Sequence, residues 1–260
     1  MKYSIEYAVM CDKGKVRKKN QDNFWCMRLY LEEENEGLPQ MYSRKVEASD
    51  LPAFAVFDGL GGERYGEVAA YIAANGFNEL YNITPKANIQ QFLKDSVMNI
   101  NQRICEYATE HCIRNVGTTA AILMFEKKAI HICNIGDSRV YRFRDKSLTQ
   151  LSQDHLATYM RKEKPPLSQN LGIPEKEFLI QPYLLQEEYR TGERYLICSD
   201  GLTDMVSDEE ISSTLESKCI KTVTYELMDL ALERGGTDNI TIIVCDVKGE
   251  GLLLRSRTKN

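Results

Sequence analysis

Four aspartates in tight turns are the residues of this sequence best suited to do chemistry: Asp58, Asp137, Asp200 and Asp238. Most of them follow an apolar run typical of a β-strand, and a strand that ends in a glycine turn can direct a carboxylate into a cleft. Carboxylates gathered at one point repel each other unless a cation lies between them. Oxygen-only ligands suit Mg²⁺ or Mn²⁺. The pattern therefore predicts a divalent metal centre that acts on an electron-rich group such as phosphate.

Taken singly, each aspartate also fits a plain turn. Asp58 opens a segment with glycines at 59, 61 and 62, which would let the backbone approach an ion closely, but glycine turns between a strand and a helix are common. Asp200 is a usual turn residue, Asp137 fits a hairpin, and Asp238 lies in an ordinary polar loop. The metal-centre hypothesis depends on the four acting together.

The elements expected to position these residues follow from hydrophobic periodicity. Strands are predicted at 3–10, 24–31, 53–57, 118–125, 129–134, 139–144, 177–183, 195–198 and 240–247. Helices are predicted at 63–81, 88–112, 154–162, 207–216 and 222–234. Residues 32–51 are expected to form a charged loop or the tip of a hairpin. Ser207 and Glu210 have the spacing of a capping box at a helix start.

Groups of strands alternate with pairs of helices in this pattern, and neighbouring strands read as antiparallel hairpins. The predicted fold class is α+β, a four-layer α/β/β/α sandwich in which two antiparallel sheets pack face to face and helix pairs flank them. With 260 residues, the chain is long enough for one large domain. We expect a single domain over residues 1–248 and a C-terminal tail over 249–260.

Composition narrows the function classes. A formal net charge of -5 argues against a protein that coats nucleic acid. No stretch approaches the run of about 18 apolar residues that a membrane helix needs, and no signal-peptide pattern is present. Several of the 8 cysteines lie in apolar strand-like runs, and no CxxC pair suggests a zinc ribbon. We expect a reduced, monomeric, cytoplasmic protein.

Six segments that carry these residues occur in the order of a known family: Arg17–Asp22, Asp58–Gly62, Gly117–Thr119, Gly136–Arg139, Ser199–Asp204 and Gly236–Thr241. The chain resembles the metal-dependent type 2C serine/threonine protein phosphatases (PPM family), and their compact bacterial-type members in particular. The resemblance spans about residues 4–247. Six ordered motifs are far more specific than any one of them.

The resemblance implies two or three Mn²⁺ or Mg²⁺ ions and a metal role for each matching residue. Asp58 would bridge two ions, and Gly59 would offer its carbonyl oxygen to one of them. Asp200 and Asp238 would complete the other. Asp137, together with Asp200, would match a more weakly held third position.

The resemblance also implies catalytic roles for Arg17, Asp22 and Asp58. Asp22 would match an acid that holds metal-bound water, and Arg17 would grip the substrate phosphate, for which a planar guanidinium suits bidentate binding. Alone, Arg17 would be a solvated turn residue in a basic run. Two positions depart from the family pattern: Gln21 stands where many members have an acid, and Leu60 where eukaryotic relatives have a proton-donating histidine.

The implied reaction is hydrolysis of phosphoserine or phosphothreonine by in-line attack of a water shared by two ions about 3.5–4 Å apart. The implied substrates are phosphorylated proteins in signalling, in opposition to a serine/threonine kinase. Two alternatives stay open: a non-catalytic phosphatase-like binding module and a small-molecule phosphomonoesterase. Retention of the metal carboxylates favours an enzyme. Substrate choice would lie in the expected flap at residues 158–176.

Overall fold

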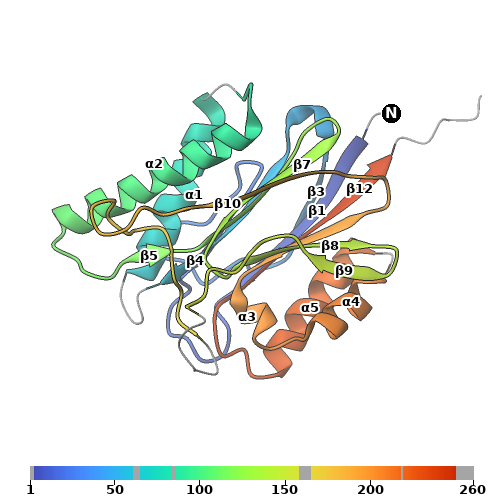
Figure 1. Cartoon of the computed structure of the whole chain (residues 1–260). Helices are drawn as coiled ribbons and strands as arrows, with labels where there is room; N and C mark the ends of the chain where they lie inside the picture. The colour runs from blue at the N-terminus through green and yellow to red at the C-terminus, as the bar shows by residue number, and fades with distance from the viewer. Residues whose placement is uncertain (1–2, 61–64, 84–85, 158–164, 218, 250–260) are drawn as a thin grey trace, which may run out of the picture.

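The computed structural model describes residues 3–60, 65–83, 86–157, 165–217 and 219–249. Two antiparallel six-stranded sheets form the centre of the molecule. Helices α1 and α2 cover one outer face, and α3, α4 and α5 cover the other (Figure 1). The predicted α+β fold class, a four-layer α/β/β/α sandwich, is confirmed.

The first sheet has the strand order β3-β1-β12-β11-β8-β9. Its strands, in chain order, are β1 (Tyr3–Asp12), β3 (Tyr42–Glu47), β8 (Arg139–Arg144), β9 (Ser147–Gln150), β11 (Arg194–Cys198) and β12 (Ile240–Gly249). Strands β1 and β12 pair along their whole lengths, from Tyr3 opposite Gly249 to Asp12 opposite Ile240. Alternate residues of β12 face the other sheet and the helices, so the strand is apolar on both faces.

The second sheet has the strand order β10-β7-β6-β4-β2, and a short strand pairs with the end of β4. Its strands are β2 (Asp22–Cys26), β4 (Ala53–Leu60), β5 (Gly117–Thr118), β6 (Ala120–Phe125), β7 (Ala129–Ile135) and β10 (Tyr183–Glu188). Strand β4 shows how the core is divided: Phe54 and Val56 pack between the sheets, whereas Ala55 and Phe57 pack against the helices.

The helices are α1 (Gly66–Ile83), α2 (Ile89–Glu110), α3 (Asp200–Thr203), α4 (Asp208–Leu215) and α5 (Ile220–Glu233), with a 3-10 turn at Ala48–Asp50. Helix α2 buries one face, as its periodicity predicts, and Asn88 caps its start. The predicted capping box of Ser207 and Glu210 is present at the start of α4. No helix within the described residues is long and apolar enough to cross a membrane.

The strand predicted at 24–31 is wrong beyond Cys26. Met27 and Arg28 have φ values of 49° and 79°, and they turn the chain back so that Cys26 and Leu29 exchange backbone hydrogen bonds of 2.8 and 3.0 Å. Positive φ at two consecutive residues is the geometry of a tight hairpin turn, which glycine or asparagine usually marks. Neither residue type is present here, so the sequence carries no signal for this turn.

Other local predictions are also wrong. The segment 32–51, expected to be a charged loop or a hairpin tip, contains the edge strand β3, which pairs with β1. The strand predicted at 177–183 is displaced to β10, because the backbone N–H groups of Glu177 and Phe178 donate to the Pro174 carbonyl and form a turn. The helix predicted at 154–162 is absent over 154–157, and its remaining residues lie outside the described ranges.

Strand β12 ends within the expected C-terminal tail. Strand β12 reaches Gly249, so this residue of the expected tail is paired in a sheet, and residues 250–260 lie outside the described ranges. The single domain over 1–248 stays a prediction. All eight cysteines are free thiols, and Cys133, Cys198 and Cys245 are buried in strands, as small hydrophobic residues would be.

Candidate metal centre

Five aspartates from separate elements gather at one end of the two sheets. Asp22 begins β2 and is paired directly with Asp58 of β4. Asp137 lies between β7 and β8, Asp200 follows β11 as the first residue of α3, and Asp238 lies just before β12. The fold therefore brings together all the acidic residues that the sequence predicts at the site.

The five carboxylates act on one another electrostatically. The pKa of Asp58 is raised well above its ordinary value, first by burial and then by repulsion from Asp200, Asp22, Asp137 and Asp238. Each neighbour disfavours a negative charge on Asp58. In the absence of a cation, a negative charge on Asp58 is therefore disfavoured both by burial and by the other four carboxylates.

Asp22 is held by two hydroxyl groups. The hydroxyls of Ser199 and Thr241 both donate to its Oδ2 at 2.7 Å, whereas its Oδ1 is buried and has no hydrogen-bond partner. Burial raises the pKa of Asp22 to about 7, and Asp200 and Asp238 add to the rise against the lowering effect of the two hydroxyls. Sequence reasoning does not single out Ser199 or Thr241, although both lie inside the ordered motifs.

Gly59 lies where the neighbouring backbone leaves no room for a side chain. Its N–H donates to the Gln21 carbonyl at 3.1 Å. A Cβ at this position would collide with the backbone oxygen of Gly66 and lie 2.5 Å from that of Gln21. A Cβ on Gly66 would in turn lie 2.9 Å from the Gly59 carbonyl oxygen. Two glycines thus keep side chains away from the carbonyl that is the predicted backbone ligand.

Arg17 reaches the cluster from the basic loop between β1 and β2. Its Nη2 donates to Asp238 Oδ2 at 2.6 Å, and its side chain is 44% exposed. That hydrogen bond is the main reason that the pKa of Arg17 is raised, and the charges of Asp58 and Asp200 also contribute. The guanidinium therefore supplies positive charge beside the carboxylates.

Asn239, which sequence reasoning treats only as a loop residue, fixes this basic loop in place. Its side-chain amide donates to the carbonyl oxygens of Lys13 at 2.8 Å and Lys19 at 2.9 Å, and its Oδ1 accepts from the Gln21 N–H at 2.8 Å. The side chain is almost completely buried. The two anchored lysines flank Arg17 on both sides, so one amide sets where the loop presents the guanidinium.

Gln21, one of the two departures from the family pattern, has its own partner. Its Nε2 donates to Glu67 Oε2 at 2.9 Å, and Lys19 Nζ lies 2.5 Å from Oε1 of the same carboxylate. Burial opposes ionisation of Glu67, but these two donors outweigh it and lower the pKa of Glu67. A carboxylate at position 21 could not donate a hydrogen bond to Glu67 and would repel it, whereas the amide of Gln21 donates to it.

Leu60, the second departure, ends β4 and places an apolar side chain beside the centre. His155 braces the backbone before Asp137: its Nδ1 accepts from the Gly136 N–H at 3.1 Å, and its backbone N–H donates to the Gly136 carbonyl at 3.0 Å. Burial lowers the pKa of His155. This histidine positions a turn.

The donor set fits hard divalent cations. It consists of carboxylates and one backbone carbonyl, it includes the unpartnered Oδ1 of Asp22, and its members repel each other as they stand. In the described part of the chain, no three histidine, cysteine, aspartate or glutamate side chains are arranged to hold one ion. Uncompensated carboxylates separate, and Asp238 is bonded to Arg17. Small side-chain movements would therefore accompany binding.

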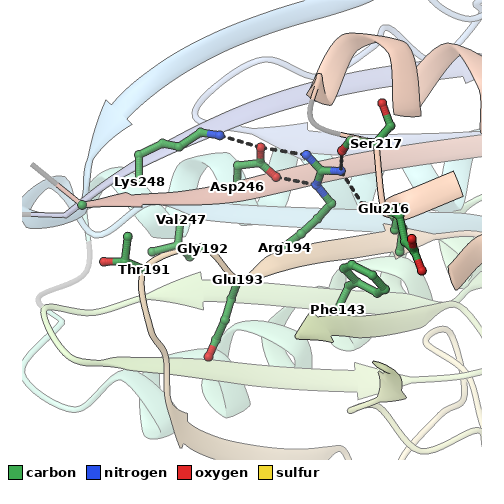
Figure 2. A pocket seen from close by; sticks show the side chains of 12 residues that line it. Phe143, Thr191, Gly192, Glu193, Arg194, Glu216, Ser217, Asp246, Val247 and Lys248 are labelled. Carbon is green, nitrogen blue, oxygen red and sulfur yellow. Dashed lines mark hydrogen bonds and ion pairs between the residues drawn. The ribbon is translucent and has the colours of Figure 1, made fainter. Parts of the chain in front are cut away.

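A separate pocket of about 490 Å³ lies near the end of β12 and is lined by none of the five aspartates (Figure 2). In it, Arg194 donates to both carboxylate oxygens of Asp246 at 2.6 and 2.9 Å, and to the carbonyls of Leu215, the last residue of α4, and Ser217. Lys248 adds a bond of 2.8 Å to Asp246. These contacts pair the charged groups with one another and tie α4 to the sheet.

The sequence is similar to known protein phosphatases. The family model described as "Protein phosphatase 2C" matches residues 40–233. The serine/threonine protein phosphatase PstP of Mycobacterium tuberculosis is 30% identical over 254 residues, which cover 94% of this chain and 45% of PstP. The serine/threonine phosphatase stp of Listeria welshimeri is 27% identical and covers 90% of this chain and 93% of its own length. The chain thus spans about half the length of PstP.

Solved structures give the same result. A crystal structure of M. tuberculosis PstP superposes with a TM-score of 0.78 at 28% identity and covers 95% of this chain and 100% of that chain. A second, with a TM-score of 0.76 and 29% identity, is of the PstP catalytic domain in complex with two manganese ions. Both superpositions cover 95% of this chain, so the likeness extends over nearly all of it.

Proposed function

The chain belongs to the protein phosphatase 2C family, and we propose that it is a metal-dependent serine/threonine protein phosphatase. The observation that carries the proposal is the gathering of Asp22, Asp58, Asp200 and Asp238 at one end of the sandwich, with Arg17 beside them. Carboxylates and a guanidinium in one place suit cations and a phosphate ester.

We assign the metal-holding residues as follows. Asp58 would bridge two cations, Gly59 would give its carbonyl to one, and Asp200 with Asp238 would hold the other. Asp137 would contribute with Asp200 to a third, weaker position. The PstP structure with two manganese ions supports Mn²⁺, with Mg²⁺ as the other hard cation that these oxygen ligands favour. Bound cations would supply a hydrolytic water of lowered pKa and positive charge beside the phosphate.

The other site residues bind and orient. Arg17 would exchange its bond with Asp238 for the equatorial oxygens of the phosphate, where a guanidinium can make two parallel hydrogen bonds. Asp22, whose Oδ2 is occupied by Ser199 and Thr241, would accept a hydrogen bond from the attacking water at Oδ1. Leu60 has no proton to give, so the proton for the leaving serine or threonine oxygen comes from another group.

The proposed substrates are phosphorylated proteins, and the proposed setting is cytoplasmic signalling, in opposition to a serine/threonine kinase. The names of the mycobacterial and listerial relatives support a serine/threonine phosphatase. We propose that the protein acts as a monomer. The small-molecule phosphomonoesterase is the second candidate, because the same acidic cluster could act on any accessible phosphate ester.

Hydrolysis of a phosphothreonine peptide tests the proposal. We expect turnover with Mn²⁺, its loss after chelation with EDTA, and its return when Mn²⁺ is restored. A protein that releases phosphate from p-nitrophenyl phosphate but not from peptides would be the small-molecule enzyme. A protein that binds Mn²⁺ and phosphopeptide without turnover would be a binding module, and activity that resists chelation would overturn the metal-dependent mechanism.

A further inference from the structure

A cavity of about 640 Å³ opens beside the candidate centre. One wall is the end of α2 with the chain that follows it, including Cys105 and Arg114. The opposite wall is formed by residues between 170 and 177, namely Asn170, Gly172, Ile173, Pro174, Lys176 and Glu177. Leu60 and Gly117, which pair across β4 and β5, close the end nearest the aspartates. Sequence reasoning places substrate choice in this part of the chain but does not predict a cavity.

The cavity begins at the end of β4, the strand that carries Asp58. Leu60 is two residues beyond Asp58 on the same strand, a distance of about 7 Å. An extended peptide advances by the same spacing of about 3.3 Å per residue. A peptide whose phosphorylated residue lies over Asp58 would therefore reach the cavity with side chains two or more positions away.

The two walls are held rigidly against each other. Asn101 of α2 donates to the Ile173 carbonyl at 3.0 Å and accepts from the Gly172 N–H at 2.7 Å. Thr118 and Leu171 exchange backbone hydrogen bonds of 3.1 and 2.9 Å. Because these bonds cross from the sheet and the helix to the 170–177 segment, the cavity exists before any ligand arrives, which lowers the entropy lost on binding.

The charged side chains that line the cavity indicate which kind of ligand it would bind. Among the described residues that line the cavity, the charged ones are the exposed Arg114 and Lys176 and the carboxylate of Glu177. These side chains carry one more positive than negative charge, although the chain as a whole carries -5. A cationic lining in an acidic protein favours acidic side chains over basic ones.

We propose that this cavity is a docking groove for the substrate peptide, and that Arg114 and Lys176 select phosphoproteins with acidic residues two or three positions from the phosphorylated serine or threonine. The inference rests on the proposed phosphatase function and adds a substrate preference to it. The groove acts on the peptide part of the substrate, whereas the aspartates and Arg17 act on the phosphate.

Charge reversal at the two cations tests the groove. The substrates are two phosphothreonine peptides that differ only in carrying Asp or Lys at the flanking positions, together with p-nitrophenyl phosphate. We expect the Arg114→Glu, Lys176→Glu double variant to lose about five- to tenfold in kcat/KM on the Asp peptide, as two exposed charge contacts reversed in sign would cause. Its activity on p-nitrophenyl phosphate should equal that of the wild type.

The matched control is Lys127→Glu with Lys128→Glu. These exposed lysines lie in the β6–β7 turn at the opposite end of β4, and their reversal changes the net charge equally. We expect this control to act as the wild type on all three substrates. Equal losses on the Asp peptide in both double variants, or an equal loss on p-nitrophenyl phosphate, would overturn the groove. A wild-type protein inactive on every substrate would instead overturn the proposed function itself, and the groove with it.

A binding readout independent of turnover uses Cys105, which lines the groove and is partly exposed. Alkylation by iodoacetamide, mapped by mass spectrometry, should slow at Cys105 when the unphosphorylated Asp peptide is added in excess. Alkylation at Cys219, an exposed thiol at the start of α5, should not change. The groove would be overturned if Cys105 labelling stayed unchanged with the unphosphorylated Asp peptide at the concentration at which the phosphorylated peptide saturates turnover.

Discussion

The five clustered aspartates differ in what compensates their charge. Asp238 is bonded to Arg17, and Asp22 accepts from two buried hydroxyls. Asp58 has burial and four neighbouring carboxylates, which raise its pKa well above the ordinary value. A cation bound at Asp58 would relieve this repulsion, which agrees with the bridging role that the family resemblance implies.

Replacing Asp58 with asparagine should abolish turnover and preserve the fold. Asparagine has the same shape but no charge, so it removes repulsion from the cluster while losing the central anionic ligand. We expect kcat on p-nitrophenyl phosphate with Mn²⁺ to fall by at least about 10²–10³-fold, as for the loss of one key electrostatic group. Circular dichroism should be unchanged.

Asp229→Asn is the control for this change, because Asp229 is exposed on α5 and remote from the centre. It should keep wild-type activity. Asp200→Asn should resemble Asp58→Asn. Full Mn²⁺-dependent activity in Asp58→Asn would show that the cluster is not the catalytic centre.

Asn239 should act on phosphate binding through Arg17. Asn239→Ala removes three hydrogen bonds that hold the basic loop, which should lower the free energy of unfolding by about 1–3 kcal/mol. Because the guanidinium is then misplaced, we expect kcat/KM to fall by about 10–100-fold. Inhibition by inorganic phosphate should weaken in parallel.

Asn101 offers a matched comparison, since it is also buried and uses its side-chain amide to bond three backbone groups. Asn101→Ala should lose similar stability, yet it should keep the wild-type inhibition constant for phosphate, measured with p-nitrophenyl phosphate as substrate. If both variants bind phosphate as the wild type does, Asn239 is only a structural residue.

At the scale of elements, the sequence predicts what depends on local pattern. The apolar spacing of α2, the capping box of α4 and the buried run of β12 all specify their elements, and each is found. The edge strand β3 is half exposed and reads as a loop. The end of β2 depends on positive φ at residues without glycine. Whether such segments form a strand or a turn depends on contacts with residues far away in the sequence.

The same distinction applies to the candidate site. Its aspartates are marked by local glycine turns, so the sequence is enough to propose them. Ser199, Thr241, Glu67 and Asn239 are revealed only by contacts that join distant segments, such as the 2.7 Å bond from Thr241 to Asp22 across 219 positions. Hydrogen-bonded support of this kind leaves no periodic signal in a single sequence.

A pair of helical glycines tests how tightly the elements must approach at the site. A Cβ on Gly201 of α3 would overlap the backbone oxygen of Asn239, which cannot yield without displacing the Asp238 loop. We expect Gly201→Ala to lower the free energy of unfolding by about 1–3 kcal/mol and to reduce kcat/KM. Thermal unfolding and p-nitrophenyl phosphate hydrolysis would measure both effects.

Gly76→Ala in α1 is the comparison. There the nearest atom to a Cβ is the flexible side chain of Ile100 at 3.3 Å. Alanine also gains about 1 kcal/mol in helix propensity over glycine. This variant should therefore keep its activity and lie close to wild-type stability. Equal behaviour of the two variants would mean that α3 and the 238–239 loop have room to separate.

At the scale of the whole molecule, the candidate centre lies at the junction of the two sheets. Asp22 and Asp58 belong to the second sheet, Asp200 and Asp238 flank strands of the first, and Asp137 lies on the connection from β7 to β8 that crosses between them. Repulsion among these carboxylates pushes the two sheet ends apart, and a bound cation would join them. Metal binding should thus affect the stability of the entire sandwich.

The contribution of the aspartate cluster to the stability of the chelated protein should fall as the pH rises from about 4 to about 7. In the folded state, Asp22 keeps its proton up to about pH 7, whereas in the unfolded chain it loses the proton near 3.8. Between these values the folded state binds more protons, so the free energy of unfolding decreases with pH, for Asp22 by at most roughly 4 kcal/mol. Asp58, whose pKa is also raised, adds to the decrease.

Mn²⁺ should reverse this dependence, because cations bind the deprotonated carboxylates and proton and metal compete for them. At pH 8, Mn²⁺ at about 100 times its Kd should add about 2.7 kcal/mol of stability, a rise in Tm of roughly 5–10 °C. At pH 5 the rise should be smaller. Thermal unfolding scans in EDTA and in Mn²⁺ at both pH values measure these shifts in Tm. In EDTA at pH 8, the Asp58→Asn variant should be more stable than the wild type. A wild-type Tm that is equal in EDTA and saturating Mn²⁺ at pH 8 would mean that no cation links the two sheets at the aspartates.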